Sequence, residues 1–182
     1  LSFHLELMIE AAEQAFPGKK VVGARNVQAH RWVTVERPAI TLETTGRTFE
    51  CNDSPVHLEV RRTDEKAELV AEADLLLAND FSEAPAPADI ELKATRKKPI
   101  PADRFYPYSL FHGPAMQCVS SLNKLGENGA VASLRVPTSE LPARPVLTDA
   151  TGQMAGLWAA SLLEKNFVIF PVAIDAIDFY AP

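Results

Sequence analysis

The sequence predicts an α+β fold, because a helical segment followed by strand-like segments occurs twice along its 182 residues. Apolar residues repeat with helical spacing at 1–16 and again at about 149–164, and alternating segments follow each helix. A proline-rich stretch of irregular pattern separates the two parts. The length fits one ordinary domain or two small subdomains sharing a core, and 47% hydrophobic residues suffice to build one.

The first helix is predicted at 1–16 and ends at Pro17-Gly18. Apolar side chains cover most of its circumference and leave a narrow polar stripe, consisting of Glu6, Glu10, Glu13 and Gln14. A stripe that narrow predicts a helix buried on most sides. The opening LSFHLEL also alternates as a strand would, so the first turn stays open between the two.

Four strands are predicted after this helix, at 19–36, 39–47, 54–63 and 67–78. Turn residues separate them, among them Asn-Asp-Ser and Thr-Asp-Glu. The last segment, AELVAEADLLLA, also has a helical composition, and we interpret it as a strand. We therefore expect a first half at 1–80, a surface linker at 81–104 and a second half at 105–182.

The second half begins with a hairpin and ends with a strand. Two strands within 116–136 flank the turn Gly126-Glu127-Asn128-Gly129. The second helix is predicted from about Asp149 to Glu164, and 166–182 continues as a strand kinked by Pro171. Neither end of the chain has the polar composition usual at a domain boundary, so we expect a piece that is incomplete at both ends.

Charge and composition exclude several classes of function. The net charge of −6 argues against affinity for nucleic acid or an anionic membrane surface. No apolar run reaches the roughly 18 residues of a membrane span, and the start lacks the basic region of a signal peptide. Two distant cysteines, Cys51 and Cys118, make no disulfide framework. We expect a soluble, cytoplasmic protein.

Three segments resemble the polyketide-synthase type of dehydratase domain, in the family's order: LELMIEAAEQAFPGKKVVGARNVQAHRWV (5–33), FYPYSLFHGPAMQ (105–117) and LTDATGQMAGLW (147–158). The first is similar to the first-half helix and strand, particularly in polyunsaturated-fatty-acid and enediyne type synthases. The second is similar to the Gly-Pro turn that opens the second half. The third carries a D-x-x-x-Q motif on the second-half helix.

The resemblance implies a double hotdog fold, in which a curved antiparallel sheet wraps each of two long helices. It implies removal of water from a β-hydroxyacyl chain on acyl carrier protein, giving a trans-enoyl thioester in fatty-acid or polyketide synthesis. The only prosthetic group expected is the carrier's phosphopantetheine arm. Acyl carrier protein and other synthase domains are the implied partners, with a homodimer as the assembly. The basic run Arg96-Lys97-Lys98, otherwise a solvated stretch, is a candidate for carrier docking.

The resemblance also assigns roles to residues. Asp149 matches the acid that protonates the leaving hydroxyl, and Gln153 matches the amide that orients it. An apolar pocket that keeps a carboxyl protonated would suit this role. His112 stands in the substrate pocket where many members have Tyr, and Gly113 and Pro114 form the adjoining turn; Tyr106 matches the tyrosine ahead of it, also lining the pocket.

One family motif is absent from the sequence. The catalytic histidine that removes the α-proton belongs to H-x-x-x-G-x-x-x-x-P, ahead of the first helix, and no such pattern occurs here. Either that histidine lies upstream of Leu1, or the chain lacks the base. In the second case it would be a non-catalytic acyl-binding or dimerisation module. A hotdog thioesterase, which also uses an acid near a helix start, is the third possibility.

The chemistry-bearing residues also have structural interpretations. Asp149 could be the N-cap of its helix, a role that stabilises by about 1 kcal/mol. We expect the remaining histidines, His4, His30 and His57, to have structural roles, and Cys118 to lie in the core. No metal-ligand spacing is visible, and the Gly126–Gly129 turn is too short for a phosphate loop.

Overall fold

The computed structural model describes residues 1–34, 39–48, 55–63, 66–86, 88, 91–93, 98–138, 141–163 and 169–181. The chain divides into two compact units, the first made of 1–85 with 171–182 and the second of 86–170. Parts of several sequence predictions lie outside the described residues: the end of the 19–36 strand, Cys51, Arg96, Lys97 and the C-terminal end of the second helix, Glu164.

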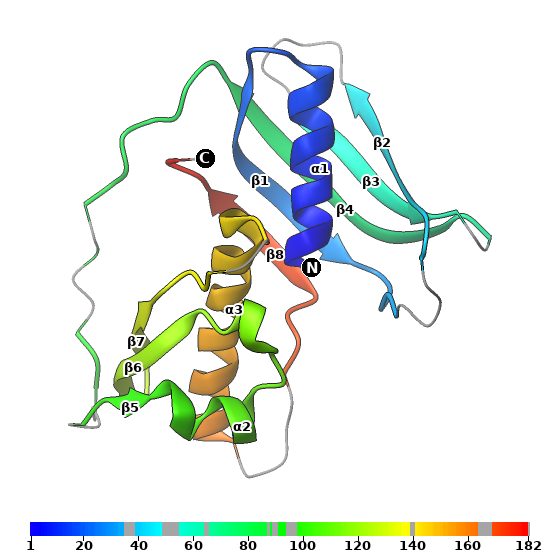
Figure 1. Cartoon of the computed structure of the whole chain (residues 1–182). Coiled ribbons are helices and arrows are strands. Elements are labelled where there is room, and N and C mark those ends of the chain that lie inside the picture. Colours follow the sequence, from blue (N-terminus) through cyan, green and yellow to red (C-terminus); the bar gives the residue numbers. More distant parts are fainter. Residues whose placement is uncertain are drawn as a thin grey trace. The chain divides into compact units, whose positions relative to one another are not determined.

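The first unit is built on a five-stranded antiparallel sheet of order β2-β3-β4-β1-β8 (Figure 1). Its strands are β1 (Lys20–Ala29), β2 (Leu42–Thr48), β3 (Val56–Arg62), β4 (Glu68–Ala78) and β8 (Ala173–Asp178). The four strands predicted before the linker all form. The segment at 67–78, whose composition also suited a helix, is the strand β4. It pairs with β1 along one edge and with β3 along the other.

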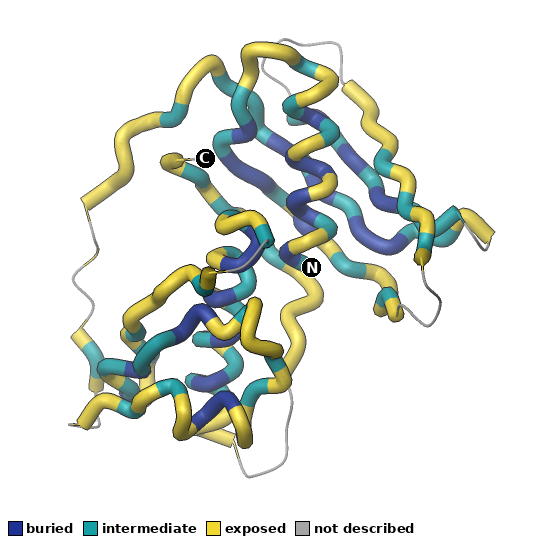
Figure 2. The backbone as a smooth tube through the Cα atoms, viewed as in Figure 1, coloured by how far each residue is buried: buried dark blue, intermediate teal, exposed yellow. Residues whose placement is uncertain are grey.

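Helix α1 (Ser2–Ala15) lies across one face of the sheet and contributes Leu5, Met8, Ile9 and Ala12 to the core (Figures 1 and 2). On β3 every second residue is buried beneath it: Val56, Leu58 and Val60. Strand geometry directs the residues between them, His57 and Glu59, to the opposite face. The sheet therefore has an apolar face under α1 and a polar face on the other side.

A β-bulge in β1 shapes the polar face. Arg25 pairs with Asp74 and Gln28 with Glu72, so two residues of β1 lie opposite one residue of β4. Asn26, the first bulged residue, has a left-handed φ of 51°, which Asn tolerates better than most residues. From there its Nδ2 donates a hydrogen bond to Asp74 Oδ2 at 2.8 Å.

The C-terminal strand lies elsewhere than the sequence analysis placed it. Residues 166–182 were assigned to the second half, but β8 pairs with β1 at the edge of the first unit's sheet. The two strands approach closely at Gly23, where a Cβ would lie 2.9 Å from the carbonyl oxygen of Ile177. The absence of a side chain at Gly23 permits this pairing, which sequence order did not reveal.

The second unit contains a three-stranded sheet of order β5-β6-β7 and the helix α3 (Ala143–Leu162). Its other elements are β5 (Ile100–Pro101), η1 (Ala102–Arg104), α2 (Tyr106–Ser109), η2 (Pro114–Met116), β6 (Val119–Gly126) and β7 (Gly129–Leu134). The predicted hairpin is confirmed, since β6 and β7 pair up to Gly126 and Gly129.

Helix α3 begins at Ala143, six residues before the predicted start. Pro145 is compatible with this start, because backbone N–H groups in a first helical turn have no intrahelical acceptor to lose. Asp149 therefore lies in the helix interior, and its interpretation as an N-cap is wrong.

Within the described part of the chain, no helix combines the length and apolarity required to cross a membrane.

Replacing two glycines by alanine should change stability in opposite directions. A Cβ on Gly126 would lie 2.6 Å from the backbone oxygen of Lys93, so Gly126→Ala should destabilise by about 1–3 kcal/mol. Gly156 lies within α3 with nothing within 4 Å of its Cβ position, so Gly156→Ala should stabilise by about 1 kcal/mol. Urea unfolding of both variants measures the two shifts. Equal shifts would contradict the close approach at Gly126.

Candidate active site

The carboxylate of Asp149 is the centre of a polar cluster in the second unit. Its Oδ2 lies 3.0 Å from Nε2 of His112 and accepts a hydrogen bond of 2.8 Å from Nε2 of Gln153. Asp149 and Gln153 are four residues apart on α3, a spacing that places side chains on the same helix face. The Asp and the Gln of the D-x-x-x-Q motif thus contact each other directly.

Gln153 connects α3 to the rest of this unit. It is only 2% exposed, and its Nε2 also donates to the carbonyl oxygen of Met116 at 2.8 Å. Its Oε1 accepts a 2.7 Å hydrogen bond from the hydroxyl of Tyr106. That hydroxyl in turn accepts a 2.8 Å bond from the backbone N–H of Val119, at the start of β6. One buried amide therefore holds α3, α2 and β6 in a fixed relation.

His112 lies in the loop between α2 and η2, where two contacts hold it. Gln117 Nε2 donates to the carbonyl oxygen of His112 at 2.9 Å, across the turn containing Gly113 and Pro114. The ring of Phe111 stacks on the imidazole with centroids 4.4 Å apart. With Nε2 directed at Asp149, the other nitrogen, Nδ1, is buried without a hydrogen-bond partner in the described residues.

An open pocket of about 520 Å³ lies beside this loop. Its lining is Ala102, Asp103, Tyr106, Pro107, Leu110, Phe111, His112, Gly113, Pro114 and Gln117. All four residues that the sequence analysis placed in a substrate pocket are in this lining. Asp149 and Gln153 are not, so His112 separates the carboxylate from the pocket.

The electrostatics of Asp149 differ from the expectation of a protonated acid. Burial acts to raise the pKa of the carboxyl, but hydrogen bonds from His112 and Gln153, with the charge of the imidazole, outweigh it. The net effect holds the pKa of Asp149 below its usual value. The group is therefore a carboxylate at neutral pH. Burial raises the pKa of Tyr106 to about 12, which keeps its hydroxyl neutral and able to donate.

The other residues with a predicted structural role have surroundings that fit it. Cys118 is fully buried, and burial raises the pKa of its thiol. His4 lies in the first turns of α1, where burial lowers its pKa to about 4. His30 and His57 belong to the first unit's sheet region and lie 3.0 Å and 2.8 Å from the carboxylates of Glu72 and Asp74.

Sequence analysis missed one group of possible ligands. It found no metal-ligand spacing, yet the structure brings His57, Glu59 and Glu72 together on the polar face of the sheet. The signal was present as HLE at 57–59 and EAD at 72–74, two strand segments with polar residues at alternate positions. Recognising it required knowing that Glu59 pairs with Glu72.

Comparisons with solved structures identify the fold. The dehydratase domain of PpsC from Mycobacterium tuberculosis, solved in complex with C12:1-CoA, matches 99% of this chain with a TM-score of 0.76 and 22% identity. A trans-AT polyketide-synthase dehydratase domain from Brevibacillus brevis matches 98%, with a TM-score of 0.76 and 18% identity. The dehydratase domain of the CurF module of curacin polyketide synthase matches 99%, with a TM-score of 0.74 and 20% identity.

The chain thus has the α+β fold of polyketide-synthase dehydratase domains, with antiparallel sheets as the resemblance implied. It spans about two thirds of the length of these domains, namely 67%, 67% and 68%. No family model matches the chain. No curated protein matches it either.

A carboxyl titration followed by NMR should find the pKa of Asp149 below its usual value of 3.8. In His112→Asn the pKa should rise, because the largest lowering contribution is removed while burial remains. Since a lowered pKa means that the folded state favours the carboxylate, this group's contribution to stability is complete above the unfolded-state pKa. It should be lost as the pH falls through the lower folded-state value. A pKa above 3.8 in the wild type would contradict the hydrogen-bond geometry.

Tyr106→Phe should destabilise the protein by about 1–3 kcal/mol, because it removes the hydroxyl that joins Val119 N–H to Gln153 and leaves that buried N–H unpaired. Tyr108→Phe is the matched control, since Tyr108 is 84% exposed and should tolerate the change. Chemical denaturation measures both. Similar losses of unfolding free energy in the two variants would mean that the hydrogen bonds of the Tyr106 hydroxyl to Gln153 and Val119 do not contribute to stability.

Proposed function

We propose that this chain is a dehydratase domain that removes water from a β-hydroxyacyl thioester, forming the trans-enoyl product. The observation that carries the proposal is the contact of Asp149 with Gln153 and His112 beside a pocket. These residues match the family's motif positions, and they occur in a fold shared with polyketide-synthase dehydratase domains.

The proposed substrate is an acyl chain carried on the phosphopantetheine arm of acyl carrier protein. Apolar side chains dominate the pocket lining, among them Pro107, Leu110 and Phe111, which suits an alkyl chain. The structurally similar PpsC domain was solved in complex with C12:1-CoA, an acyl thioester. Reaction within the carrier-bound chain requires no further prosthetic group in this proposal.

In the proposed mechanism, Asp149 and His112 act as a pair on the leaving hydroxyl. Hydroxide is a poor leaving group, so its departure requires proton donation in the transition state. His112 lies at the pocket wall, and its Nε2 lies 3.0 Å from Asp149, so the pair would hold the proton beside the pocket while the carboxylate stabilises the charge of the imidazole. Donation to the substrate requires the buried Nδ1 of His112 to become accessible from the pocket.

Gln153 has a positioning role in this mechanism. Its Nε2 is shared between the Asp149 carboxylate and the carbonyl oxygen of Met116, which restricts the rotation of both side chains. Removal of the α-proton is assigned to a histidine outside these 182 residues, consistent with a chain that spans two thirds of the similar domains. The developing negative charge of the thioester oxygen then requires N–H donors.

The proposal extends to architecture and assembly. Each unit would be one half of a double hotdog, and the domain would function as a homodimer within a synthase in the cytoplasm. A polyunsaturated-fatty-acid type of synthase is the variety that the first segment most resembles. For the carrier, the proposed docking region is the run Arg96-Lys97-Lys98, of which Lys98 is described and exposed.

The test is turnover of a β-hydroxyacyl pantetheine thioester by the full-length protein, followed by mass spectrometry. Asp149→Asn should lower the rate by about 10²–10⁴-fold, the usual contribution of acid–base catalysis, while the fold is kept. The matched control is Asp175→Asn, which neutralises an exposed carboxylate on β8 and should leave the rate unchanged.

The products separate the alternatives. Loss of one water from the substrate supports the dehydratase, whereas release of free acid and thiol would indicate a thioesterase. Binding without turnover would indicate an acyl-binding module. Full activity of Asp149→Asn would mean that the proton comes from another group.

A further inference from the structure

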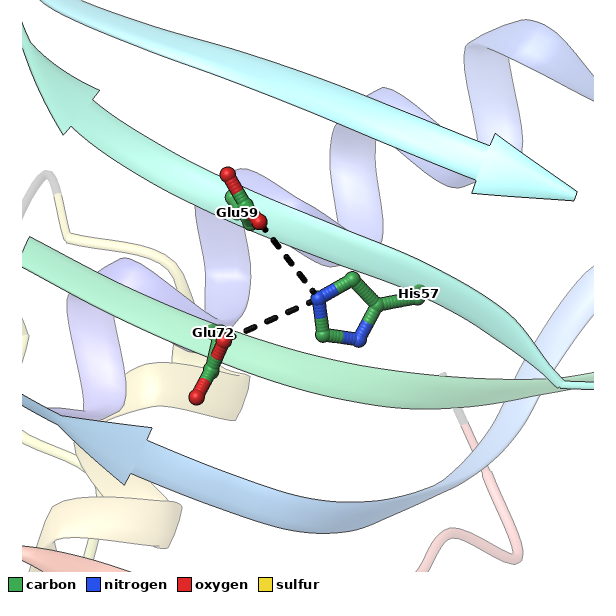
Figure 3. Close-up of side chains that lie close together, drawn as sticks. All are labelled: His57, Glu59 and Glu72. Carbon is green, nitrogen blue, oxygen red and sulfur yellow. Dashed lines mark ion pairs between the residues drawn. The ribbon is translucent and has the colours of Figure 1, made fainter. Parts of the chain in front are cut away.

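Three ligand atoms converge on the polar face of the first unit's sheet (Figure 3). Nε2 of His57 lies 3.7 Å from Oε1 of Glu59 and 3.7 Å from Oε2 of Glu72, and the three atoms all lie within 4.8 Å of one another. Tetrahedral zinc with bonds of about 2.0–2.1 Å separates its ligand atoms by about 3.4 Å. The two distances from the imidazole nitrogen are within a few tenths of an ångström of this value, and rotation of the glutamate side chains would adjust the distance between their oxygens.

The imidazole of His57 has its tautomer set for coordination. Its Nδ1 lies 2.8 Å from Oδ1 of Asp74, the residue directly opposite on β4. A donated Nδ1–H leaves the lone pair on Nε2, directed at the two glutamates. Histidines that bind metals almost always donate their other nitrogen to a carboxylate or carbonyl in this way. Asn26, at the bulge in β1, fixes the other oxygen of Asp74.

Each glutamate is held by an outer partner through one oxygen and offers the second. Arg61 donates to Oε2 of Glu59 from Nε at 2.9 Å and from Nη2 at 2.7 Å. His30 Nε2 lies 3.0 Å from Oε1 of Glu72. The two oxygens that face Nε2 of His57, Oε1 of Glu59 and Oε2 of Glu72, are those left over by these contacts.

The strand register places like charges opposite each other in this cluster, and Arg61 offsets the repulsion at Glu59, whose pKa it lowers. Glu59 and Glu72 are direct cross-strand partners on β3 and β4, and like charges directly opposite destabilise a sheet. Asp74 adds a third carboxylate opposite His57. A divalent cation would remove the repulsion between the two glutamates. The side chains of His57, Glu59 and Glu72 are 26%, 16% and 25% exposed, so an ion can enter from solvent.

We propose that His57, Glu59 and Glu72 form a binding site for a divalent transition-metal ion, with zinc as the favoured occupant. One imidazole nitrogen and two carboxylate oxygens suit zinc better than magnesium or calcium, which prefer oxygen ligands alone. The two carboxylates balance the charge of the ion, which would cross-link β3 to β4. The site lies in the first unit, and it does not depend on the proposed dehydratase function.

Zinc titration of the full-length protein by isothermal calorimetry, in a buffer that does not chelate metals, tests the proposal. The wild type should bind one zinc ion at this site, and excess magnesium should not displace it. Glu59→Gln and Glu72→Gln keep side-chain size while weakening a ligand, and each should lower the affinity at least tenfold. Glu68→Gln is the matched control, because Glu68 is on the same strand but pairs with Arg31 at 3.4 Å.

A second control separates this site from the other histidine–carboxylate pair. His112→Asn removes the imidazole beside Asp149 and should leave the zinc affinity unchanged. Zinc should also raise the melting temperature of the wild type, through binding to the folded state, and do so much less for Glu72→Gln. The zinc-induced shift is measured against each variant's own melting temperature without zinc, so a change in stability from the substitution itself does not affect it.

Three results would overturn the proposal. The first is no zinc binding by the wild type, which would mean that the contacts with Arg61 and His30 suffice to hold the two glutamates together. The second is equal affinity in the wild type and both glutamine variants. The third is loss of binding in His112→Asn, which would place the ion in the other unit.

Discussion

The candidate active site depends on the hydrogen bonds of one buried side-chain amide, that of Gln153. Its two polar atoms make three hydrogen bonds, to Tyr106, Met116 and Asp149, and bring together three segments of the second unit. If these partners were absent, each unpaired polar group of the buried amide would destabilise the fold by the cost of its desolvation, about 1–3 kcal/mol. The packing of this unit and the orientation of the carboxylate therefore have one common cause.

The alternation of strand residues has a similar double effect in the first unit. The period of two that buries Val56, Leu58 and Val60 under α1 also directs His57 and Glu59 to the other face. Antiparallel register then places acidic residues of β4 opposite them. An apolar core and a dense polar cluster are consequently two sides of the same pattern, and a change of register by one residue would destroy both.

Local patterns predicted the elements well, and pairing between distant segments was beyond them. The 3.6-residue period gave α1, alternation gave β1 to β4, and the Gly126–Gly129 turn gave the hairpin. The pairing of β8 with β1 depends on contacts between residues about 150 positions apart, for which the sequence carries no local signal. The start of α3 was misplaced because Asp149 was interpreted as a possible N-cap, whereas the helix begins at Ala143 and includes Pro145, which is compatible with a first helical turn.

The motif resemblance identified which residues contact one another, but it did not predict the direction in which the pKa of Asp149 is shifted. Asp149, Gln153, His112 and Tyr106 were all named from sequence, and the structure joins them in one network. The direction of the Asp149 pKa depends on whether burial or hydrogen bonding dominates, and that balance is set by donor positions within 3.0 Å. His112 lines the pocket and Asp149 does not, so an ionisable ring lies between the carboxylate and the pocket. In the proposed mechanism, donation of the proton therefore depends on both residues, because His112 lines the pocket and Asp149 contacts the imidazole behind it.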